Sequence, residues 1–253
     1  FQSHFDGTAH IYFSNTGSGN TIRNNILINP HATYPIRISS SGRTEIYNNV
    51  IYAPRTSGIY LDLRSTTTTK IKNNILVCNS SCLYVYNSSS ENNSDSDFNL
   101  FYVENTNRLV EKENPLTYYN FSAWRLVAQN DSNSFLLTNI SNIQFTNISG
   151  YPNSSGIINL ILLRNSPAID NGTNLSAYFT TDFSGITRPK DGDENGSAEW
   201  DIGAYEYIDY PTLSLISPAN NLAQTSSLAI TFTYNVSDVG SIANCSLIIN
   251  GAI

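Results

Sequence analysis

A repeated motif reads Ile22-Arg23-Asn24-Asn25-Ile26-Leu27, then Ile46-Tyr47-Asn48-Asn49-Val50-Ile51, then Ile71-Lys72-Asn73-Asn74-Ile75-Leu76. The step is 24 residues from Asn24 to Asn48 and 25 residues from Asn48 to Asn73. A degenerate fourth copy follows at Asp97-Phe98-Asn99-Leu100-Phe101. A constant period of this size indicates a solenoid in which each repeat supplies one turn.

A second motif interleaves with the first at the same period. It reads Ile11-Tyr12-Phe13-Ser14, Ile36-Arg37-Ile38-Ser39, Ile59-Tyr60-Leu61-Asp62 and Leu83-Tyr84-Val85-Tyr86. Apolar and polar residues alternate in each copy, as in a β-strand with one buried face. Residues 10–100 contain no apolar stripe with helical spacing. The two motifs therefore predict short strands that stack turn upon turn, about 4.8 Å apart.

The Asn pairs are expected where the chain turns a corner. Asn tolerates left-handed backbone angles, and its side-chain amide can bond to the amides of the turns above and below. We therefore interpret the pairs as a structural Asn ladder and not as ligand-binding residues.

The spacing of these motifs resembles the right-handed parallel β-helix repeats of the pectate-lyase-like superfamily. The resemblance covers about residues 10–102 and implies that fold, but it says little about activity, because this helix serves lyases, hydrolases, adhesins and phage spikes. We assign residues 1–163 to the β-helix, with a short helix-containing insertion near residues 103–135. The helix is expected over residues 122–128, after an N-cap Ser, with Trp124, Val127 and Ala128 on one face.

Residues 164–209 carry a different succession of motifs. They read Ser166-Pro167-Ala168-Ile169-Asp170, Asp182-Phe183-Ser184-Gly185, Arg188-Pro189 and Asp201-Ile202-Gly203-Ala204-Tyr205-Glu206. This order resembles the C-terminal module called choice-of-anchor Q, which caps β-helices in surface proteins of bacteria and archaea. The resemblance implies that residues 164–209 form the C-terminal part of the β-helix.

Residues 210–253 show strand patterns at 212–216, 228–236 and 245–249, separated by turns. They resemble the first half of a bacterial or archaeal immunoglobulin-like domain. The chain contains no Met and begins in mid-pattern, so we interpret it as a stretch of a longer polypeptide. The expected fold class is thus all-β: a right-handed parallel β-helix solenoid followed by a truncated immunoglobulin-like β-sandwich segment, poorly ordered or docked on the helix.

Composition points to a secreted or cell-surface protein. Only 13% of the residues are charged and the formal net charge is −7. Without a basic run the chain is a poor match for nucleic acid. Asn-x-Ser/Thr sequons run from Asn79 to Asn244, and either composition alone or glycosylation explains them. Cys78 and Cys82 form either a disulfide or an inert buried pair, while Cys245 has no evident partner.

The best candidate for a metal site is Asp191-Gly192-Asp193-Glu194-Asn195-Gly196, followed by Glu199 and Asp201. Alternating oxygen donors and a turn-forming Gly suit a Ca²⁺ loop. Position twelve of an EF-hand loop would be Ile202, so this is no EF-hand. A β-type loop predicts Ca²⁺ on Asp191, Asp193 and Asn195, with Glu199 or Asp201, and the alternative is an acidic solvated turn.

The outward residues of the second motif predict a binding surface. Tyr12, Arg37, Tyr60 and Tyr84 stack in one column, and Ser14, Ser39, Asp62 and Tyr86 run beside it. Sugar rings pack on aromatic faces, and Arg and Asp bond hydroxyls or carboxylates. We therefore predict glycan binding by Tyr12, Arg37, Tyr60, Asp62, Tyr84 and Tyr86, against the alternative of an ordinary β-sheet surface.

Catalysis is left open by the sequence. The weak catalytic candidates are Asp62, Arg64 and Arg37, which offer a single carboxylate and not the cluster that lyases or hydrolases of this superfamily use. A surface ion pair between Asp62 and Arg64 is the simpler interpretation. We expect a monomeric surface protein that binds polysaccharide or glycan without cleaving it and without inserting in a membrane. The alternatives are a polysaccharide lyase or glycoside hydrolase, and a structural adhesin or stalk.

Overall fold

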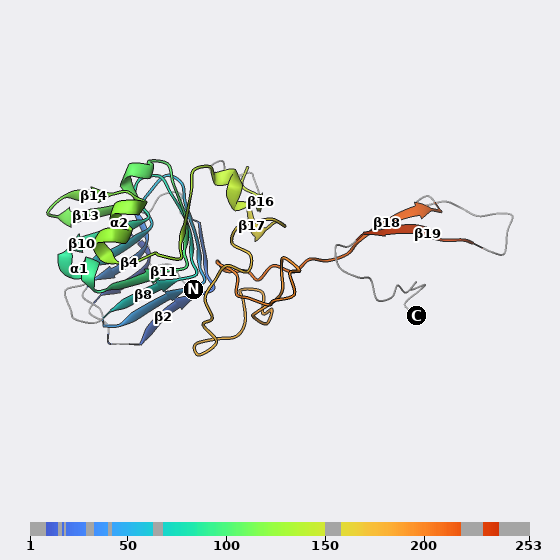
Figure 1. The fold of residues 1–253 in the computed structure, drawn as a ribbon, viewed down its shortest axis with the longest axis horizontal. Coiled ribbons are helices and arrows are strands. Elements are labelled where there is room, and N and C mark those ends of the chain that lie inside the picture. The colour runs from blue at the N-terminus through green and yellow to red at the C-terminus, as the bar shows by residue number, and fades with distance from the viewer. Residues whose placement is uncertain are drawn as a thin grey trace.

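The computed structural model describes residues 9–14, 17, 19–28, 33–39, 42–62, 68–149, 158–218 and 230–237. Three mainly parallel sheets wrap around one axis as a β-helix, and a hairpin projects from the body (Figure 1). Sheet A contains β1 (Ala9–Ser14), β4 (Tyr34–Ser39), β7 (Ile59–Asp62), β10 (Leu83–Asn87), β13 (Val110–Asn114) and the antiparallel β14 (Thr117–Tyr119). Sheet B contains β2 (Asn20–Arg23), β5 (Thr44–Tyr47), β8 (Thr69–Lys72) and β11 (Ser94–Asp97). Sheet C contains β3 (Ile26–Ile28), β6 (Val50–Ala53), β9 (Ile75–Cys78), β12 (Leu100–Val103) and β15 (Phe135–Leu137).

Both sequence repeats are confirmed as turns of this solenoid. The second motif forms the first four strands of sheet A, and the Asn-Asn motif runs from sheet B around a corner into sheet C. The register stacks like on like, with Ile22 opposite Ile46 and Ile46 opposite Ile71. These isoleucines point inward into one apolar core that extends along the axis. Burial of this core is what the alternation of apolar and polar residues encodes.

The Asn at the second position of each corner forms the predicted ladder, which comprises Asn25, Asn49, Asn74 and Asn99. The side-chain oxygen of Asn74 accepts hydrogen bonds from the backbone N–H of Asn49 at 3.0 Å and from its side-chain amide at 2.9 Å. The same pair of bonds links Asn25 to Asn49 and Asn74 to Asn99. Asn49, Asn74 and Asn99 are fully buried, so these bonds replace water for groups that have lost it.

The first residue of each pair takes the left-handed conformation that makes the corner. The backbone angle φ is 51° at Asn24, 48° at Asn48 and 57° at Asn73. In the degenerate fourth copy Phe98 adopts the same conformation, with φ of 55°. Asn lowers the cost of this geometry at three corners, and the fourth shows that stacking imposes it on a residue that does not favour it.

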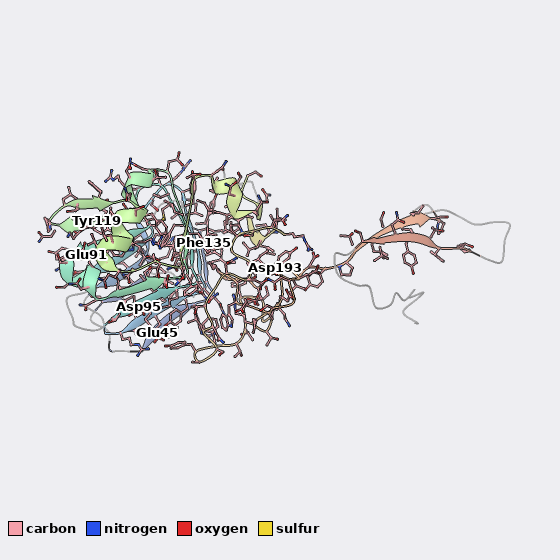
Figure 2. The ribbon with its side chains drawn as sticks, in the orientation of Figure 1. Glu45, Glu91, Asp95, Tyr119, Phe135 and Asp193 are labelled. Carbon is pink, nitrogen blue, oxygen red and sulfur yellow. A yellow bond between two sulfur atoms is a disulfide. The ribbon has the colours of Figure 1, made fainter. Side chains whose placement is uncertain are left out.

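Short helices close the far end of the solenoid. They are α1 (Ser88–Asn92), η1 (Thr106–Arg108) and α2 (Phe121–Ala128). The predicted helix is confirmed, but its N-cap is Asn120, which accepts a bond from the Ala123 N–H, and not Ser122. Val127 is exposed while Trp124 is buried, so the predicted apolar face is only partly right. Glu91 and Tyr119, both labelled in Figure 2, lie at this end. Glu91 forms a buried ion pair with Lys112.

Beyond β15 the chain leaves the solenoid and lies against its outside. After η2 (Ile140–Ile143), β16 (Phe145–Asn147) pairs in antiparallel fashion with β17 (Asn159–Leu162). Residues 164–209, which we call the outer segment, contain isolated bridges and add no further turn to the solenoid. Ala168, Ile169, Ile202 and Ala204 pack on the outward apolar side chains of sheet C. The outer segment therefore covers one face of the β-helix instead of extending it.

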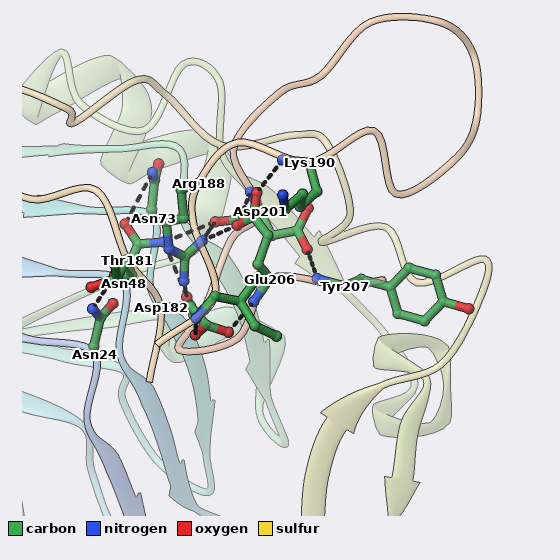
Figure 3. Close-up of polar contacts among 12 residues, drawn as sticks. Asn24, Asn48, Asn73, Thr181, Asp182, Arg188, Lys190, Asp201, Glu206 and Tyr207 are labelled. Carbon is green, nitrogen blue, oxygen red and sulfur yellow. Dashed lines mark hydrogen bonds and ion pairs between the residues drawn. The ribbon is translucent and has the colours of Figure 1, made fainter. Parts of the chain in front are cut away.

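The first Asn of each corner holds the outer segment in place (Figure 3). The side-chain amide of Asn24 donates to the Thr181 carbonyl at 2.6 Å, and that of Asn48 donates to the carbonyls of Asp201 and Gly203. Asn73 donates to the Thr173 carbonyl and accepts from the Thr173 N–H, both at 2.8 Å. One Asn of each pair thus serves the solenoid and the other serves its covering.

The hairpin consists of β18 (Thr212–Ser217) and β19 (Thr233–Ser237). The first strand predicted after residue 210 is thereby confirmed and the second is confirmed at its C-terminal end. The third, at residues 245–249, lies outside the described residues, as does Cys245. No helix within the described ranges is long and apolar enough to cross a membrane.

Cys78, at the end of β9, and Cys82, just before β10, are joined by a disulfide. Both residues are fully buried. Of the two alternatives from the sequence, the bridge is the one that the structure contains.

Replacing Asn74 with Ala should destabilise the protein by about 3 kcal/mol or more, because buried donors on Asn49 lose their acceptor and each unsatisfied group costs roughly 1–3 kcal/mol. Chemical denaturation measures this change. The matched control is Asn25→Ala, at the half-exposed end of the ladder, which should cost roughly 1 kcal/mol. An equal decrease in the free energy of unfolding in the two variants would contradict a ladder whose contribution to stability depends on burial.

Candidate functional site

The predicted column of outward side chains is present on sheet A. Tyr12 pairs in register with Arg37, Arg37 with Tyr60, and Tyr60 with Tyr84. The next strand continues the column with Glu111 opposite Tyr84. Strand alternation, which puts the flanking Ile, Leu and Val residues inside, sends these side chains outward. We call Tyr12, Arg37, Tyr60 and Tyr84 the ring column.

The rings of this column pack on one another. Tyr60 stacks on Tyr84 with centroids 5.0 Å apart, and the Arg37 guanidinium lies 5.2 Å from the Tyr12 ring and 4.9 Å from the Tyr60 ring. Tyr34, which the sequence analysis did not single out, contacts both Tyr60 and Tyr84, at 4.9 and 5.3 Å. Consequently Tyr60 is only 7% exposed, whereas Tyr12 at the end of the column is 44% exposed.

Packing also raises the pKa values of the tyrosines in and beside the column. Burial, with added repulsion from nearby carboxylates such as Glu111 and Glu113, raises the pKa of Tyr34, Tyr60 and Tyr84 above the usual value for tyrosine. Tyrosine is already neutral at physiological pH, and the shift extends that neutral, hydrogen-bonding form to more alkaline pH. Arg37 supplies positive charge among them and donates from Nε to the Ser39 hydroxyl at 3.4 Å.

The second predicted column is also on this face. Ser14 pairs with Ser39, and Ser39 with Asp62. Tyr86 follows Val85, which pairs with Leu61, and so lies at the level of Asp62. Ser39 and Asp62 are both 7% exposed. Arg64 lies outside the described residues, so its predicted pairing with Asp62 stays a prediction.

A cluster of three carboxylates lies on the outer segment. One oxygen from each of Asp170, Asp191 and Asp193 falls within 4.8 Å of the others, and we call these residues the acidic cluster. Asp170 comes from a turn about twenty residues earlier in the chain and holds the loop by accepting from the N–H groups of Gly192 and Asp193, both at 2.9 Å. Burial and the neighbouring Asp193 raise the pKa of Asp170. Sequence spacing within the loop gave no signal for Asp170.

The other predicted ligands of this loop lie differently. Asn195 stays beside the cluster, with its side-chain amide donating to Asp193 at 2.9 Å. Glu199 is exposed and contacts the Ser197 hydroxyl at 3.4 Å. Asp201 is buried, and its two oxygens accept from the backbone N–H groups of Asp170 and Tyr207. Asp201 therefore shapes the backbone that presents Asp170 and is not turned toward the cluster.

A pocket of about 230 Å³ adjoins the acidic cluster. Its lining includes Arg164, Ser166, Asn171 and Asp193. Arg164 also forms ion pairs with Asp209 and, at 3.3 Å, with Glu194. In Figure 2 Asp193 lies on the side of the body from which the hairpin departs.

The charged motif residues of the outer segment form a buried network (Figure 3). The Arg188 guanidinium donates to Glu206 at 2.5 Å and to the carbonyls of Asp201 and Gly203 at 3.2 and 2.9 Å. Asp182 accepts from the Glu206 N–H. Burial outweighs the attraction of Arg188 and raises the pKa of Glu206 to about 7. These contacts close the segment on itself and give Asp182, Arg188 and Glu206 a structural role.

Comparison with known proteins bears on the solenoid. Residues 2–107 match the family model described as right handed beta helix region. The match covers the four turns of stacked strands and gives the solenoid its hand. No curated protein matches the chain, and no solved structure does. The match does not extend to the outer segment or to the hairpin.

Proposed function

We propose that this chain is part of an extracellular or cell-surface β-helix protein that binds a polysaccharide or glycan along the outer face of sheet A. The observation that carries the proposal is the ring column, an extended row of rings with Arg37 among them and Tyr12 open at one end. A long polar face suits a polymer, whereas small molecules favour enclosed pockets. The outer segment covers the corresponding face of sheet C and leaves that face no such role.

The stacking within the column refines which residues would touch the ligand. The buried ring of Tyr60 offers little surface, so its role in the proposal is to hold Tyr84 and Arg37 in fixed positions. Tyr12 would supply the exposed ring face for a sugar, and Tyr84 an accessible edge. Arg37 and Tyr86 would bond hydroxyls or carboxylates at its flank, whereas Asp62 is as little exposed as Tyr60 and would support its neighbours.

The proposed protein binds without cleaving and acts as a monomer. Acid-base cleavage of glycosides requires a pair of positioned titratable groups. Asp62 and Arg37 stand on neighbouring turns and together supply one carboxylate. Glu111 and Glu113 stand two strands beyond Asp62 on β13, and the acidic cluster lies on the outer segment instead of sheet A. A polysaccharide lyase or glycoside hydrolase that uses Asp62, Arg37 and Arg64 is the second candidate. A structural adhesin or stalk without a sugar ligand is the third.

We further propose that the acidic cluster binds Ca²⁺. Three carboxylates that converge from two segments are hard oxygen donors of the type that Ca²⁺ prefers. One oxygen of Asp170 is buried without a hydrogen-bond partner, and coordination of a cation would satisfy it. Asn195 stands close enough to add an amide oxygen if its side chain turns over. Ca²⁺ would tie the loop at residue 191 to the turn at residue 170.

The outer segment and the hairpin fit a protein that stands on a surface. We propose that residues 164–209 are a choice-of-anchor Q module and that residues 210–253 begin an immunoglobulin-like stalk domain. In the hairpin, Leu213 pairs with Val236 and Leu215 with Tyr234, so one face of the ribbon is apolar. A face of this kind supports a sandwich, in which a second sheet covers it.

Replacing Tyr12 with Ala should weaken binding of the cognate glycan roughly tenfold, because a sugar ring loses its aromatic platform. A glycan array followed by calorimetry measures the change. Tyr210→Ala is the matched control, since Tyr210 is 67% exposed but lies far from sheet A in the chain. Unchanged glycan affinity in Tyr12→Ala would contradict the proposal that Tyr12 is an aromatic platform. Release of unsaturated or reducing ends that stops in Asp62→Asn would establish the enzyme instead.

Ca²⁺ should raise the melting temperature by roughly 5 °C, because a cation at about 100 times its Kd stabilises the folded state by about 2.7 kcal/mol. EDTA should reverse the shift, and Asp193→Asn should abolish it. Glu199→Gln removes a carboxylate from the same loop but outside the cluster, so it should retain the shift. A shift that persists in Asp193→Asn would place the cation elsewhere.

The backbone amides of Leu213 and Leu215 should exchange their hydrogens slowly if a second sheet covers the hairpin. An isolated two-stranded hairpin is marginally stable in water, so its amides would exchange within the dead time of the measurement. Hydrogen exchange with mass spectrometry distinguishes the two. Rapid exchange throughout residues 212–237 would contradict the sandwich.

A further inference from the structure

The outward face of sheet B carries four cations among three carboxylates, which are Glu45, Asp95 and Asp97. Its first column places Glu45 opposite Lys70 and Lys70 opposite Asp95, and its second places Tyr47 between Arg23 and Lys72. Arg43 lies just before β5. Four of the 13 Lys and Arg residues of the chain therefore gather here, although the formal net charge is −7. Figure 2 places Glu45 and Asp95 on this side of the body.

The outer segment covers one column of this face and stops beside the other. Leu175, Phe179 and Trp200 bury the Tyr47 side chain. The Tyr178 ring packs 5.0 Å from the Tyr47 ring but stays 40% exposed. The Tyr178 hydroxyl thus marks a seam where the outer segment meets the charged column of sheet B.

Three hydrogen-bond donors converge at this seam: the Lys70 ammonium, the Arg43 guanidinium and the Tyr178 hydroxyl. Lys70 Nζ lies 3.5 Å and Arg43 Nη2 lies 3.4 Å from the Tyr178 hydroxyl oxygen. Both separations are long for a hydrogen bond to a neutral phenol. The pKa of Tyr178 is lowered, first by the contact with the Tyr47 hydroxyl and then by the Lys70 ammonium. A phenol between two cations offers one weak acceptor to two strong donors.

The two lysines of β8 differ in whether they form an ion pair. Lys72 forms an ion pair with Asp95 at 2.9 Å. In the described part of the chain, by contrast, no carboxylate lies within ion-pair distance of Lys70. Arg43 is paired with Glu45 at 2.5 Å but has a half-exposed side chain, with donors left on its guanidinium. Among the described residues Lys70 therefore directs its ammonium at Tyr178 and not into an ion pair, although Glu45 and Asp95 flank it in register.

We propose that Lys70, Arg43 and Tyr178 form a second binding site, which takes an oxyanion carried by an acidic polysaccharide. This inference rests on the proposed function, because the polysaccharide is the polymer assigned there to sheet A. A carboxylate or a sulfate between the three donors would accept charge-assisted hydrogen bonds from both cations and one from the phenol. The seam is open to solvent, because the Tyr178 residue is 40% exposed and the Arg43 side chain 46% exposed.

The test compares charge removal at two positions of one strand. Lys70→Gln and Lys72→Gln remove the same charge two residues apart, and Tyr178→Phe removes only the hydroxyl. Each is titrated by calorimetry at about 0.15 M salt with dextran sulfate, polygalacturonate and neutral dextran of similar length. Circular dichroism verifies that each variant folds. The sulfated and the uronate chains distinguish the two sources of the oxyanion.

Wild-type protein should bind at least one acidic chain more tightly than dextran. Lys70→Gln and Tyr178→Phe should weaken that binding about fivefold to tenfold, while Lys72→Gln should change it by less than about twofold. Equal effects of Lys70→Gln and Lys72→Gln would overturn the proposal, because they would indicate diffuse attraction. Absence of any preference for acidic chains would also overturn it.

The two sites fail independently. If Tyr12→Ala leaves glycan binding unchanged while Lys70→Gln weakens binding of the acidic chain, the sheet A proposal is wrong and the sheet B site stands. The reverse result removes the sheet B site and keeps the ring column.

Discussion

Hydrogen bonding at one buried corner is the constraint on which this structure depends. A solenoid turn that bends from sheet B to sheet C must bury backbone groups that no strand partner can satisfy. Asn49, Asn74 and Asn99 satisfy them by bonding both to the next turn and to carbonyls of the sheet B strand in the preceding turn. At the last turn Asp131 and Ser134 take over the acceptor role for Asn99. Because every turn supplies the acceptor for the one before it, the corner also fixes the register of all three sheets.

The same corner determines where the outer segment lies. The left-handed residue of each pair has its side chain outside the solenoid, so its amide is available to carbonyls of residues 173–203. Gly203, with φ of 103°, lets this backbone approach so closely that a Cβ there would meet the Ile75 side chain at 2.7 Å. The outer segment then buries the outward apolar residues of sheet C. The remaining outer surfaces, sheet A and part of sheet B, are those to which we assign ligands.

These two surfaces differ in the number of charged groups that they present to a ligand. On sheet A aromatic rings surround one guanidinium and stay neutral, which favours the hydroxyl-rich faces of sugars. On sheet B cations gather beside a single exposed phenol, which favours an anionic substituent. A polymer that carries both sugar faces and anionic substituents could contact sheet A and sheet B of the same β-helix.

The sequence by itself determined the solenoid, its period, the strand faces and the role of the Asn pairs, because these follow from local alternation and from like residues stacking on like. It also placed Tyr12, Arg37, Tyr60 and Tyr84 in one column. Only the tertiary structure decided that Tyr60 is covered by Tyr34 and Tyr84, that Asp170 joins Asp191 and Asp193, and that Asp201 turns inward. It also decided that Tyr178 meets Lys70, 108 residues away in the chain. Such contacts depend on how the outer segment folds back on the β-helix, and no short-range periodicity encodes that path.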